Sequence, residues 1–287
     1  MMLRHVEVQG HRGARGLFPE NTLEGFRRAA PLCDSFELDI AITADGVPVI
    51  CHDPALNPAI ARGPDGAWIA APGPLVREMT RDQLDAYDVG RLRPDTAYAA
   101  RYPDQMPIDG LRVPSLDEVL AITPPLRLNI ELKTLADRPE ATVSAMAMAD
   151  AVMAVVQAAG ATERVMIESF DWRGPRHIRR HYPDMAVAWL TEPKTVAAAR
   201  LWWDGPAPED FAGSIPRAIA AEGGGTWAPE WQSLTEAEVI EAKSLGLAVL
   251  PWTVNEAEAM TRLIAWGVDG LITDRPDIAR VALERAG

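Results

Sequence analysis

Short runs of apolar and β-branched residues recur along the chain, and Gly, Pro, Asn or Asp residues bound most of them. Runs of this length and composition predict β-strands. Amphipathic stretches with helical spacing separate many of these runs. Strands are expected at residues 6–10, 36–42, 47–51, 127–132, 165–169, 185–190, 247–253 and 268–273.

Signals for helix ends accompany the amphipathic stretches. Asn21 is expected to cap a helix that runs to about residue 32, with Glu24 three positions later completing a capping box. Ser115 and Glu118 repeat this signature, and Gly160 is expected to end a helix over residues 139–159. Further helices are expected at residues 235–245, 256–266 and 276–285.

The alternation of strand and helix predicts an α/β protein with a parallel sheet. About eight strands in 287 residues fit a closed (β/α)8 TIM barrel better than an open doubly wound sheet. No Gly-rich dinucleotide fingerprint follows the first strand, which also disfavours the open sheet. We therefore expect a single domain over residues 1–287.

Residues 53–113 interrupt this regularity. Their periodicity fades, and they contain eight of the 24 prolines. A segment of this length is too long for a plain connection within a compact domain. We expect an inserted lid or small subdomain, placed after the second-strand region of the barrel.

The charge balance of the chain narrows its possible partners. Lys and Arg number 28 and Asp and Glu number 41, which gives a formal charge of −13. Nucleic acids and anionic membranes require clustered cations, so neither partner is expected. Residues 141–162 are apolar but mostly Ala, with Asp150 near their middle, and stable membrane insertion is not expected. Because the N-terminus does not resemble a secretory signal, we expect a cytoplasmic protein.

Polar side chains mark the predicted ends of the barrel strands, where TIM barrels carry their functional groups. Residues i and i+2 of a strand share a face, so Glu37 is expected beside Asp39 and Glu131 beside Lys133. The candidate site residues are His11, Arg12, Glu37, Asp39, His52, Glu131, Lys133, Trp252 and Asn255.

Three carboxylates that converge at one mouth would repel one another unless a cation lay between them. Oxygen ligands suit a hard divalent ion, so the pattern predicts one Mg²⁺ or Ca²⁺. His11 and His52 would supply acid–base chemistry, and Arg12 would bind phosphate. Each motif alone has a plainer interpretation, including a solvated strand face, an ion pair, a helix cap at Asn255 or core packing of Trp252. Their joint occurrence in this order is far more specific.

These motifs together resemble those of the glycerophosphodiester phosphodiesterase family. The similarity extends over nearly the whole chain in the family's order. It is carried by residues 11–13 (HRG), 19–22 (PENT), 36–39 (FELD), 43–53 (TADGVPVICHD), 113–120 (VPSLDEVL), 129–133 (NIELK), 169–171 (SFD), 252–255 (WTVN) and 267–274 (GVDGLITD). Residues 31–35 lack the Gly-Ala-Asp that often precedes the family's E-x-D motif.

The resemblance implies a TIM barrel with a lid-like insertion and a metal-dependent phosphodiesterase activity. The substrate would be a small glycerophosphodiester such as glycerophosphocholine, which is cleaved to sn-glycerol 3-phosphate and an alcohol. It also implies a role for each matching residue. Glu37, Asp39 and Glu131 match the metal ligands, His11 and His52 the acid–base pair, and Arg12 and Lys133 the phosphate-contacting cations.

The family mechanism implies that the glycerol 2-hydroxyl attacks first and that water then opens a cyclic phosphate. We assign His52 as the acid and His11 as the base, although the reverse is open. The nearest alternative is a lysophospholipase D-like activity on lysophospholipids, and a non-catalytic phosphoester-binding barrel is a more distant one. The headgroup, the choice of metal and the oligomeric state stay open.

Several aromatic residues are candidates for headgroup contacts. Trp252, together with Asn255, is expected to bind substrate. Trp227 and Trp231 would stack on a choline headgroup, touch a lipid tail or pack in the core. The aromatic residues of the insertion would line a pocket or hold the insertion onto the barrel; they are Trp68, Tyr87, Tyr98 and Tyr102.

Overall fold

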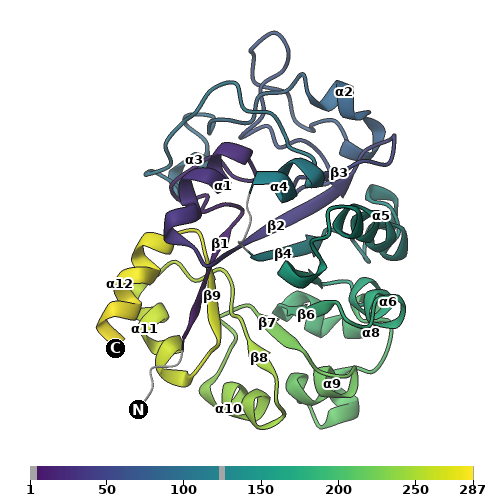
Figure 1. Ribbon diagram of the computed structural model, residues 1–287, viewed down its shortest axis with the longest axis vertical. Coiled ribbons are helices and arrows are strands. Elements are labelled where there is room, and N and C mark those ends of the chain that lie inside the picture. Colours follow the sequence, from purple (N-terminus) through teal and green to yellow (C-terminus); the bar gives the residue numbers. More distant parts are fainter. Residues whose placement is uncertain (1–4, 123–126, 287) are drawn as a thin grey trace.

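The strands form one curved sheet that nearly closes on itself. In the computed structural model, which describes residues 5–122 and 127–286, neighbouring strands pair in parallel in the order β8-β7-β6-β5-β4-β2-β1-β9. This arrangement confirms the predicted (β/α)8 TIM barrel (Figure 1). The barrel strands are β1 Glu7–His11, β2 Ser35–Ile42, β4 Arg127–Leu132, β5 Val165–Ser169, β6 Ala186–Thr191, β7 Thr226–Pro229, β8 Ala248–Val249 and β9 Gly270–Thr273.

Backbone hydrogen bonds close the seam between β8 and β9. The amides of Asp269 and Ile272 donate to the carbonyl oxygens of Val249 and Pro251 at 2.9 and 3.0 Å, and the Val254 amide donates to Ile272 at 2.9 Å. Proline has no amide hydrogen for a ladder, so β8 ends after two residues. The prediction of a strand over residues 247–253 is therefore too long.

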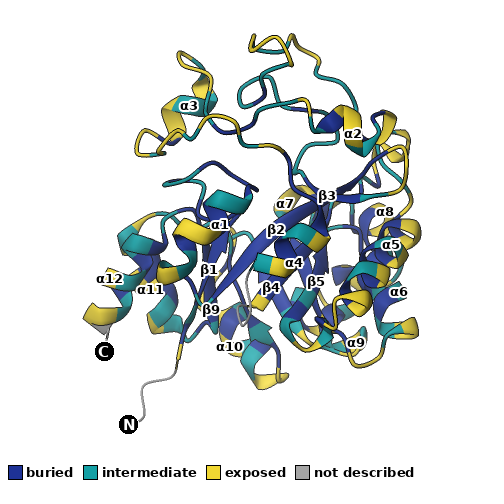
Figure 2. Cartoon of the chain, turned by 45° about the horizontal axis from the view of Figure 1, so that its top comes forward, coloured by how far each residue is buried: buried dark blue, intermediate teal, exposed yellow. Residues whose placement is uncertain are grey.

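Helices surround the barrel and cover its outer face (Figures 1 and 2). Along β2 the side chains of Phe36, Leu38 and Ile40 pack in the main hydrophobic core, whereas Glu37 and Asp39 alternate with them and point inward. The surrounding helices are α1 Leu23–Ala29, α4 Leu116–Ile122, α5 Ala145–Ala158, α6 Arg173–His181, α7 Pro193–Ala197, α8 Ala199–Trp202, α9 Ile215–Ala221, α10 Glu236–Ser244, α11 Ala257–Trp266 and α12 Pro276–Ala286.

Two predicted helix starts are wrong. Thr22, not Asn21, caps α1, because its hydroxyl accepts a hydrogen bond from the Gly25 amide at 3.1 Å. The helix predicted from residue 139 begins only at Ala145, behind its cap Ser144. Residues Pro139–Ala141 form a separate 3-10 turn.

The insertion packs as an irregular unit against the hairpin of β2 and β3 (Pro48–Ile50), at the top of Figure 1. It contains two short helices, α2 (Arg81–Leu84) and α3 (Ala97–Arg101), and a 3-10 turn at Val76–Glu78. Leu56, Val76 and Leu84 belong to a small core separate from that of the barrel. Its role as a lid stays a prediction.

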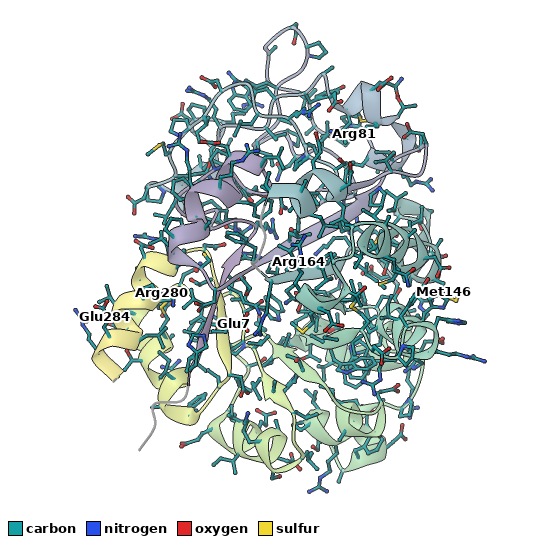
Figure 3. All side chains as sticks on the ribbon, viewed as in Figure 1. Glu7, Arg81, Met146, Arg164, Arg280 and Glu284 are labelled. Carbon is teal, nitrogen blue, oxygen red and sulfur yellow. The ribbon has the colours of Figure 1, made fainter. Side chains whose placement is uncertain are left out.

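Asp34 ties the first strand to the last helix. Its Oδ2 accepts from the Val8 amide at 2.8 Å, and its Oδ1 accepts from the Arg280 guanidinium at 2.9 Å. Arg280 lies on α12 and also donates to the carbonyl of Leu32 at 2.9 Å (Figure 3). These contacts join segments that lie far apart in the sequence and hold β1, the start of β2 and α12 together.

One stretch, Pro139–Ala158, has the length and apolar composition of a membrane span. Most of it is α5, whose residues Met148, Val152 and Val156 are buried in the main core. The helix contacts α4 and α6, while Met146 on its outer side is half-exposed (Figure 3). The apolar face of this helix therefore packs in the main core, against the outer face of the barrel.

Candidate active site

The loop after β1 has a tightly turned backbone. Arg12, Gly13 and Ala14 have positive φ values of 51°, 76° and 65°. For non-glycine residues this left-handed conformation costs about 1 kcal/mol or more. The Arg12 amide donates to the main-chain oxygen of Glu37 at 3.0 Å and to its Oε2 at 3.1 Å. These bonds hold the turn and place the Arg12 side chain over β2.

His11 ends β1 and is held by a carboxylate from β9's end. Its Nδ1 lies 2.6 Å from Oδ1 of Asp274. Asp274 in turn accepts hydrogen bonds from Asn255 and from Nε of Arg15, both at 2.8 Å. A carboxylate at Nδ1 favours the tautomer that carries its proton there. Nε2 of His11 therefore lacks a proton when the ring is neutral, and it lies 3.6 Å from Oε2 of Glu37.

His52 follows β3 and has a similar arrangement. Its Nδ1 lies 2.7 Å from Oδ1 of Asp53, whose Oδ2 accepts from the Asn57 amide at 3.1 Å. About 32% of the His52 side chain is exposed, and it lines the same pocket as His11. The two imidazoles thus meet at one pocket, each held through Nδ1 by an aspartate.

Burial, followed by the charge of Arg15, lowers the pKa of His11 to about 4. Burial, followed by the charges of Arg12 and Lys133, lowers the pKa of His52 to about 4. In the substrate-free site both imidazoles are therefore neutral at pH 7.

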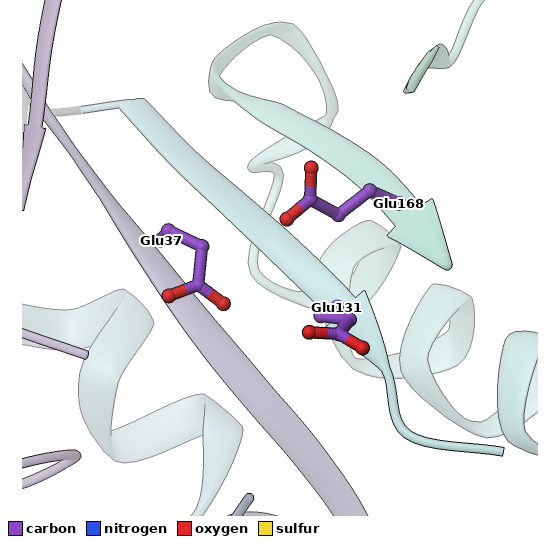
Figure 4. A group of neighbouring side chains, drawn as sticks. All are labelled: Glu37, Glu131 and Glu168. Carbon is purple, nitrogen blue, oxygen red and sulfur yellow. The ribbon is translucent and has the colours of Figure 1, made fainter. Parts of the chain in front are cut away.

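Three buried glutamates meet inside the barrel (Figure 4). They are Glu37 on β2, Glu131 on β4 and Glu168 on β5, and one carboxylate oxygen of each lies within 4.8 Å of the others. Burial, with Asp39 next, raises the pKa of Glu37 well above its ordinary value. Burial is also the largest cause that raises the pKa of Glu131 to about 7 and that of Glu168 to about 8.

Asp39 lies at the same mouth but faces cations. Its Oδ2 accepts from the Asn21 amide at 2.9 Å and lies 3.1 Å from Nε of Arg12, while its Oδ1 lies 3.7 Å from Nζ of Lys133. Burial acts to raise the pKa of Asp39, but Arg12, His52 and Lys133 hold it well below its usual range. Asp39 is therefore a charged carboxylate beside the three glutamates.

The carboxylate cluster fits a divalent cation. Within the described part of the chain, Oε1 of Glu37 and Oδ1 of Asp39 are buried and accept no hydrogen bond. Crowded carboxylate oxygens without donors are the ligands that a hard cation such as Mg²⁺ or Ca²⁺ prefers. Glu168 belongs to this cluster, and the sequence analysis did not identify it.

A pocket of about 290 Å³ opens over these groups. Its lining includes the two imidazoles, the three clustered glutamates and the cations Arg12, Arg15, Lys133 and Lys194. The lining also includes apolar side chains, Leu135, Phe170, Leu190, Trp202 and Trp252, and the carboxylate of Glu192. The arrangement can bind a phosphate at its cations and move protons through two imidazoles.

Most of the predicted site residues line this pocket. They are His11, Arg12, Glu37, His52, Glu131, Lys133 and Trp252. Asp39 lies beneath Arg12, and Asn255 bonds to Asp274 and Thr273. The structure adds Arg15 and Asp274, which the sequence analysis did not single out. Asp274 directly follows the last strand, a position that could have identified it.

The other aromatic candidates have structural contacts. Trp227 is 2% exposed and donates its indole N–H to Thr191 at 2.8 Å. The Trp231 ring lies 5.7 Å from the Arg262 guanidinium. In the insertion, Tyr98 bonds to Glu20 and to Arg15, and the Tyr102 ring lies 4.9 Å from the same guanidinium. Tyr98 and Tyr102 thus hold the insertion against the loop after β1.

Comparisons with known proteins show what this chain is similar to. The family model described as "Glycerophosphoryl diester phosphodiesterase family" matches residues 11–278. The chain is 32% identical to the uncharacterised protein YqiK of Bacillus subtilis strain 168, over 97% of this chain and 99% of that protein. It is 26% identical to a glycerophosphodiester phosphodiesterase of Caldanaerobacter subterraneus subsp. tengcongensis, over 94% of each.

A solved structure gives the same result for the fold. It is that of a protein from Silicibacter pomeroyi DSS-3, named provisionally as a glycerophosphoryl diester phosphodiesterase. The two proteins superpose with a TM-score of 0.89 at 37% sequence identity, and the match covers 98% of this chain and 94% of that one.

Proposed function

Because this chain belongs to the glycerophosphoryl diester phosphodiesterase family and is a glycerophosphodiester phosphodiesterase, we propose that His11 and His52 carry its acid–base chemistry and that a divalent cation assists it. The products are sn-glycerol 3-phosphate and an alcohol. The observation that carries this proposal is the pair of aspartate-held imidazoles facing one pocket with buried carboxylates and cations.

The cations of the pocket bind the phosphodiester. Arg12 lines the pocket while its Nη1 donates to Glu20 at 3.0 Å, and its positive charge together with the compact charge of Lys133 attracts the phosphate. Lys133 is held in place by Glu131, whose Oε1 lies 2.8 Å from its Nζ. Arg15 lines the same pocket and contributes further positive charge.

Glu37, Asp39 and Glu131, together with Glu168, would hold one divalent cation, either Mg²⁺ or Ca²⁺. When bound, such a cation neutralises charge on the phosphate and on the developing transition state. The four carboxylates differ in environment, because Asp39 already faces Arg12 and Lys133. A bound cation would therefore relieve more unfavourable charge at Glu37, Glu131 and Glu168, whose pKa values are raised, than at Asp39.

Proton transfer follows from the orientation of the two imidazoles. His11, neutral and held at Nδ1 by Asp274, takes the proton of the glycerol 2-hydroxyl as that oxygen attacks phosphorus. His52 gives a proton to the oxygen of the departing alcohol. The negative phosphate offsets the charges of Arg12 and Lys133 and so favours the protonated form of His52.

The second half of the reaction reverses these roles. Attack by the 2-hydroxyl leaves a cyclic phosphate and a released alcohol. His52, now neutral, takes a proton from water, and the resulting oxygen attacks phosphorus. His11 returns its proton to the 2-oxygen as the ring opens, which leaves sn-glycerol 3-phosphate and restores both imidazoles.

The test uses glycerophosphoglycerol, whose headgroup is uncharged, and a coupled assay for sn-glycerol 3-phosphate. The metal-free protein is assayed with EDTA, Mg²⁺ or Ca²⁺, beside the His11→Ala variant. We expect turnover that needs a divalent cation and falls by about 10²-fold or more in the variant. Turnover in EDTA, or an unaffected variant, would overturn the proposal. Release of choline from lysophosphatidylcholine, without turnover of glycerophosphoglycerol, would favour the lysophospholipase D alternative.

A further inference from the structure

One arm of the insertion, residues 96–106, reaches the loop after β1 and contains α3. The side-chain amide of Gln105 donates to the main-chain oxygen of Arg15 at 2.7 Å. The main-chain amide of Met106 donates to the main-chain oxygen of Leu17 at 2.8 Å. Two hydrogen bonds to main-chain oxygens therefore dock the arm on this loop.

Tyr98, on α3, places its hydroxyl between two charged side chains of the same loop. The hydroxyl donates to Oε2 of Glu20 and accepts from Nη1 of Arg15 at 3.3 Å. A carboxylate can only accept and a guanidinium can only donate, so a hydroxyl, which does both, joins them. Burial, followed by the charge of Glu20, raises the pKa of Tyr98, and the hydroxyl therefore keeps the proton that it donates.

Glu20 connects the Tyr98 hydroxyl to Arg12. Its Oε1 accepts from Nη1 of Arg12 at 3.0 Å, and only 5% of the Glu20 side chain and 9% of the Arg12 side chain are exposed. A free carboxylate can accept two parallel hydrogen bonds from one guanidinium. Because Tyr98 occupies Oε2, Glu20 holds Arg12 through one oxygen. The rest of the guanidinium is left for Asp39, 3.1 Å from its Nε, and for a phosphate.

Arg15 extends the same chain of contacts toward His11. Its Nε donates at 2.8 Å to Oδ1 of Asp274, the atom that faces Nδ1 of His11. The 3.3 Å bond from Arg15 to Tyr98 is long for a hydrogen bond from nitrogen to oxygen. The Tyr102 ring, 4.9 Å from the Arg15 guanidinium, supports Arg15 independently. Loss of the Tyr98 hydroxyl should therefore disturb Arg12, through Glu20, more than Arg15.

We propose that Tyr98 is a positioning residue for phosphate binding and that it acts through Glu20 on Arg12. The insertion thereby supplies part of the geometry of the phosphate site, although Tyr98 itself is not among the residues that line the pocket. This assignment rests on the proposed role of Arg12 in holding the phosphodiester. The phosphate is held in the substrate and in the transition state alike, so loss of the hydroxyl weakens binding and leaves the chemical step nearly unchanged.

The test variant is Tyr98→Phe, which removes the hydroxyl and keeps the ring that packs edge to face on Tyr102, with centroids 5.3 Å apart. For glycerophosphoglycerol with Mg²⁺ or Ca²⁺ present, we expect KM to rise by about tenfold and kcat to stay within about threefold. Calorimetric titration with sn-glycerol 3-phosphate under the same conditions should show the same loss of affinity. The matched control is Tyr102→Phe, which keeps the ring over Arg15 and removes a hydroxyl that bonds to no described residue. It should change neither quantity.

Glu20→Ala tests the route of this effect. In that background Tyr98→Phe should change the affinity for sn-glycerol 3-phosphate by less than about twofold, because the partner of the hydroxyl is already absent. An unchanged affinity in Tyr98→Phe alone, a fall in kcat without a rise in KM, or an equal loss in Tyr102→Phe would overturn the positioning role. So would a wild type that does not bind the ligand. Absence of turnover with every diester would overturn the proposed function, and the calorimetric comparison would still decide the role of Tyr98.

Discussion

Replacing Glu168 by Gln should make the metal-free protein more stable while weakening its hold on a divalent cation. Burial, followed by the charge of Glu131, raises the pKa of Glu168 from 4.5 to about 8. A carboxyl group whose pKa is raised on folding contributes stability that is fully present below its unfolded pKa and is lost as pH rises through the folded pKa. The metal-free protein therefore loses stability between about pH 4.5 and pH 8.

The size of this loss follows from the shift. At about 1.4 kcal/mol per pKa unit, the raised pKa of Glu168 lowers the free energy of unfolding by about 3 kcal/mol at pH 7 and about 1 kcal/mol at pH 5, because the carboxyl ionises in the unfolded chain while the folded chain retains its proton. Gln keeps the oxygen that accepts the 2.7 Å hydrogen bond from Asn129, so the variant removes charge with little change of shape. Glu168→Gln should therefore be more stable than the wild type in EDTA, with the larger gain at pH 7.

Urea unfolding followed by circular dichroism, in EDTA at pH 5 and pH 7, measures this gain. The matched control Glu236→Gln, at an exposed glutamate on α10, should stay within about 0.5 kcal/mol of the wild type. Adding Mg²⁺ or Ca²⁺ should reverse the order, because the wild type has one more anionic ligand to gain from the cation. A Glu168→Gln variant that is no more stable in EDTA, or equally stabilised by the cation, would refute this account of the cluster.

Three other changes test separate parts of the structure. His52→Ala should lower kcat by about 10²-fold or more, and near-normal turnover would exclude it as the acid. Asp274→Asn should lower kcat by about 10²-fold with little change in KM, since it alters the partner of the His11 Nδ1; a change confined to KM would contradict this. Asp34→Asn should lose about 1 kcal/mol of unfolding free energy at pH 7. Burial opposes the effect, but hydrogen bonds from Arg280 and the backbone keep the pKa of Asp34 below its ordinary value. The difference in unfolding free energy between the wild type and Asp34→Asn should therefore disappear when urea unfolding is measured at a pH below the pKa of Asp34.

The hydrophobic pattern predicted the barrel because strand periodicity and strand–helix alternation are properties of the chain itself. It missed β7, a four-residue strand that follows a run of glycines and ends at a proline. It also placed the first helix cap one residue early, since Asn21 and Thr22 are both good caps and only Thr22 has the required geometry. Asn21 instead bonds to Asp39 across the mouth, a contact that depends on the folded barrel.

In the candidate site, too, the sequence predicted what depends on local motifs and missed what depends on contacts made in the folded barrel. Motifs at the strand ends identified both imidazoles, Arg12, Lys133 and two of the three clustered glutamates, because parallel strands bring those ends together. Glu168 was missed because it is a single acidic residue inside an apolar strand, and its significance depends on the register that pairs it with Glu131. Asp274 was likewise not identified as the partner of His11, since the two residues are 263 positions apart in sequence.

The most direct test of the central claim is a ³¹P nuclear magnetic resonance time course of glycerophosphoglycerol hydrolysis by the purified protein. With Mg²⁺ or Ca²⁺ present, we predict that the diester signal is replaced by that of sn-glycerol 3-phosphate, and that EDTA stops the conversion until the cation is restored. A diester that persists with the cation present, or conversion that continues in EDTA, would contradict metal-assisted phosphodiester hydrolysis at this site.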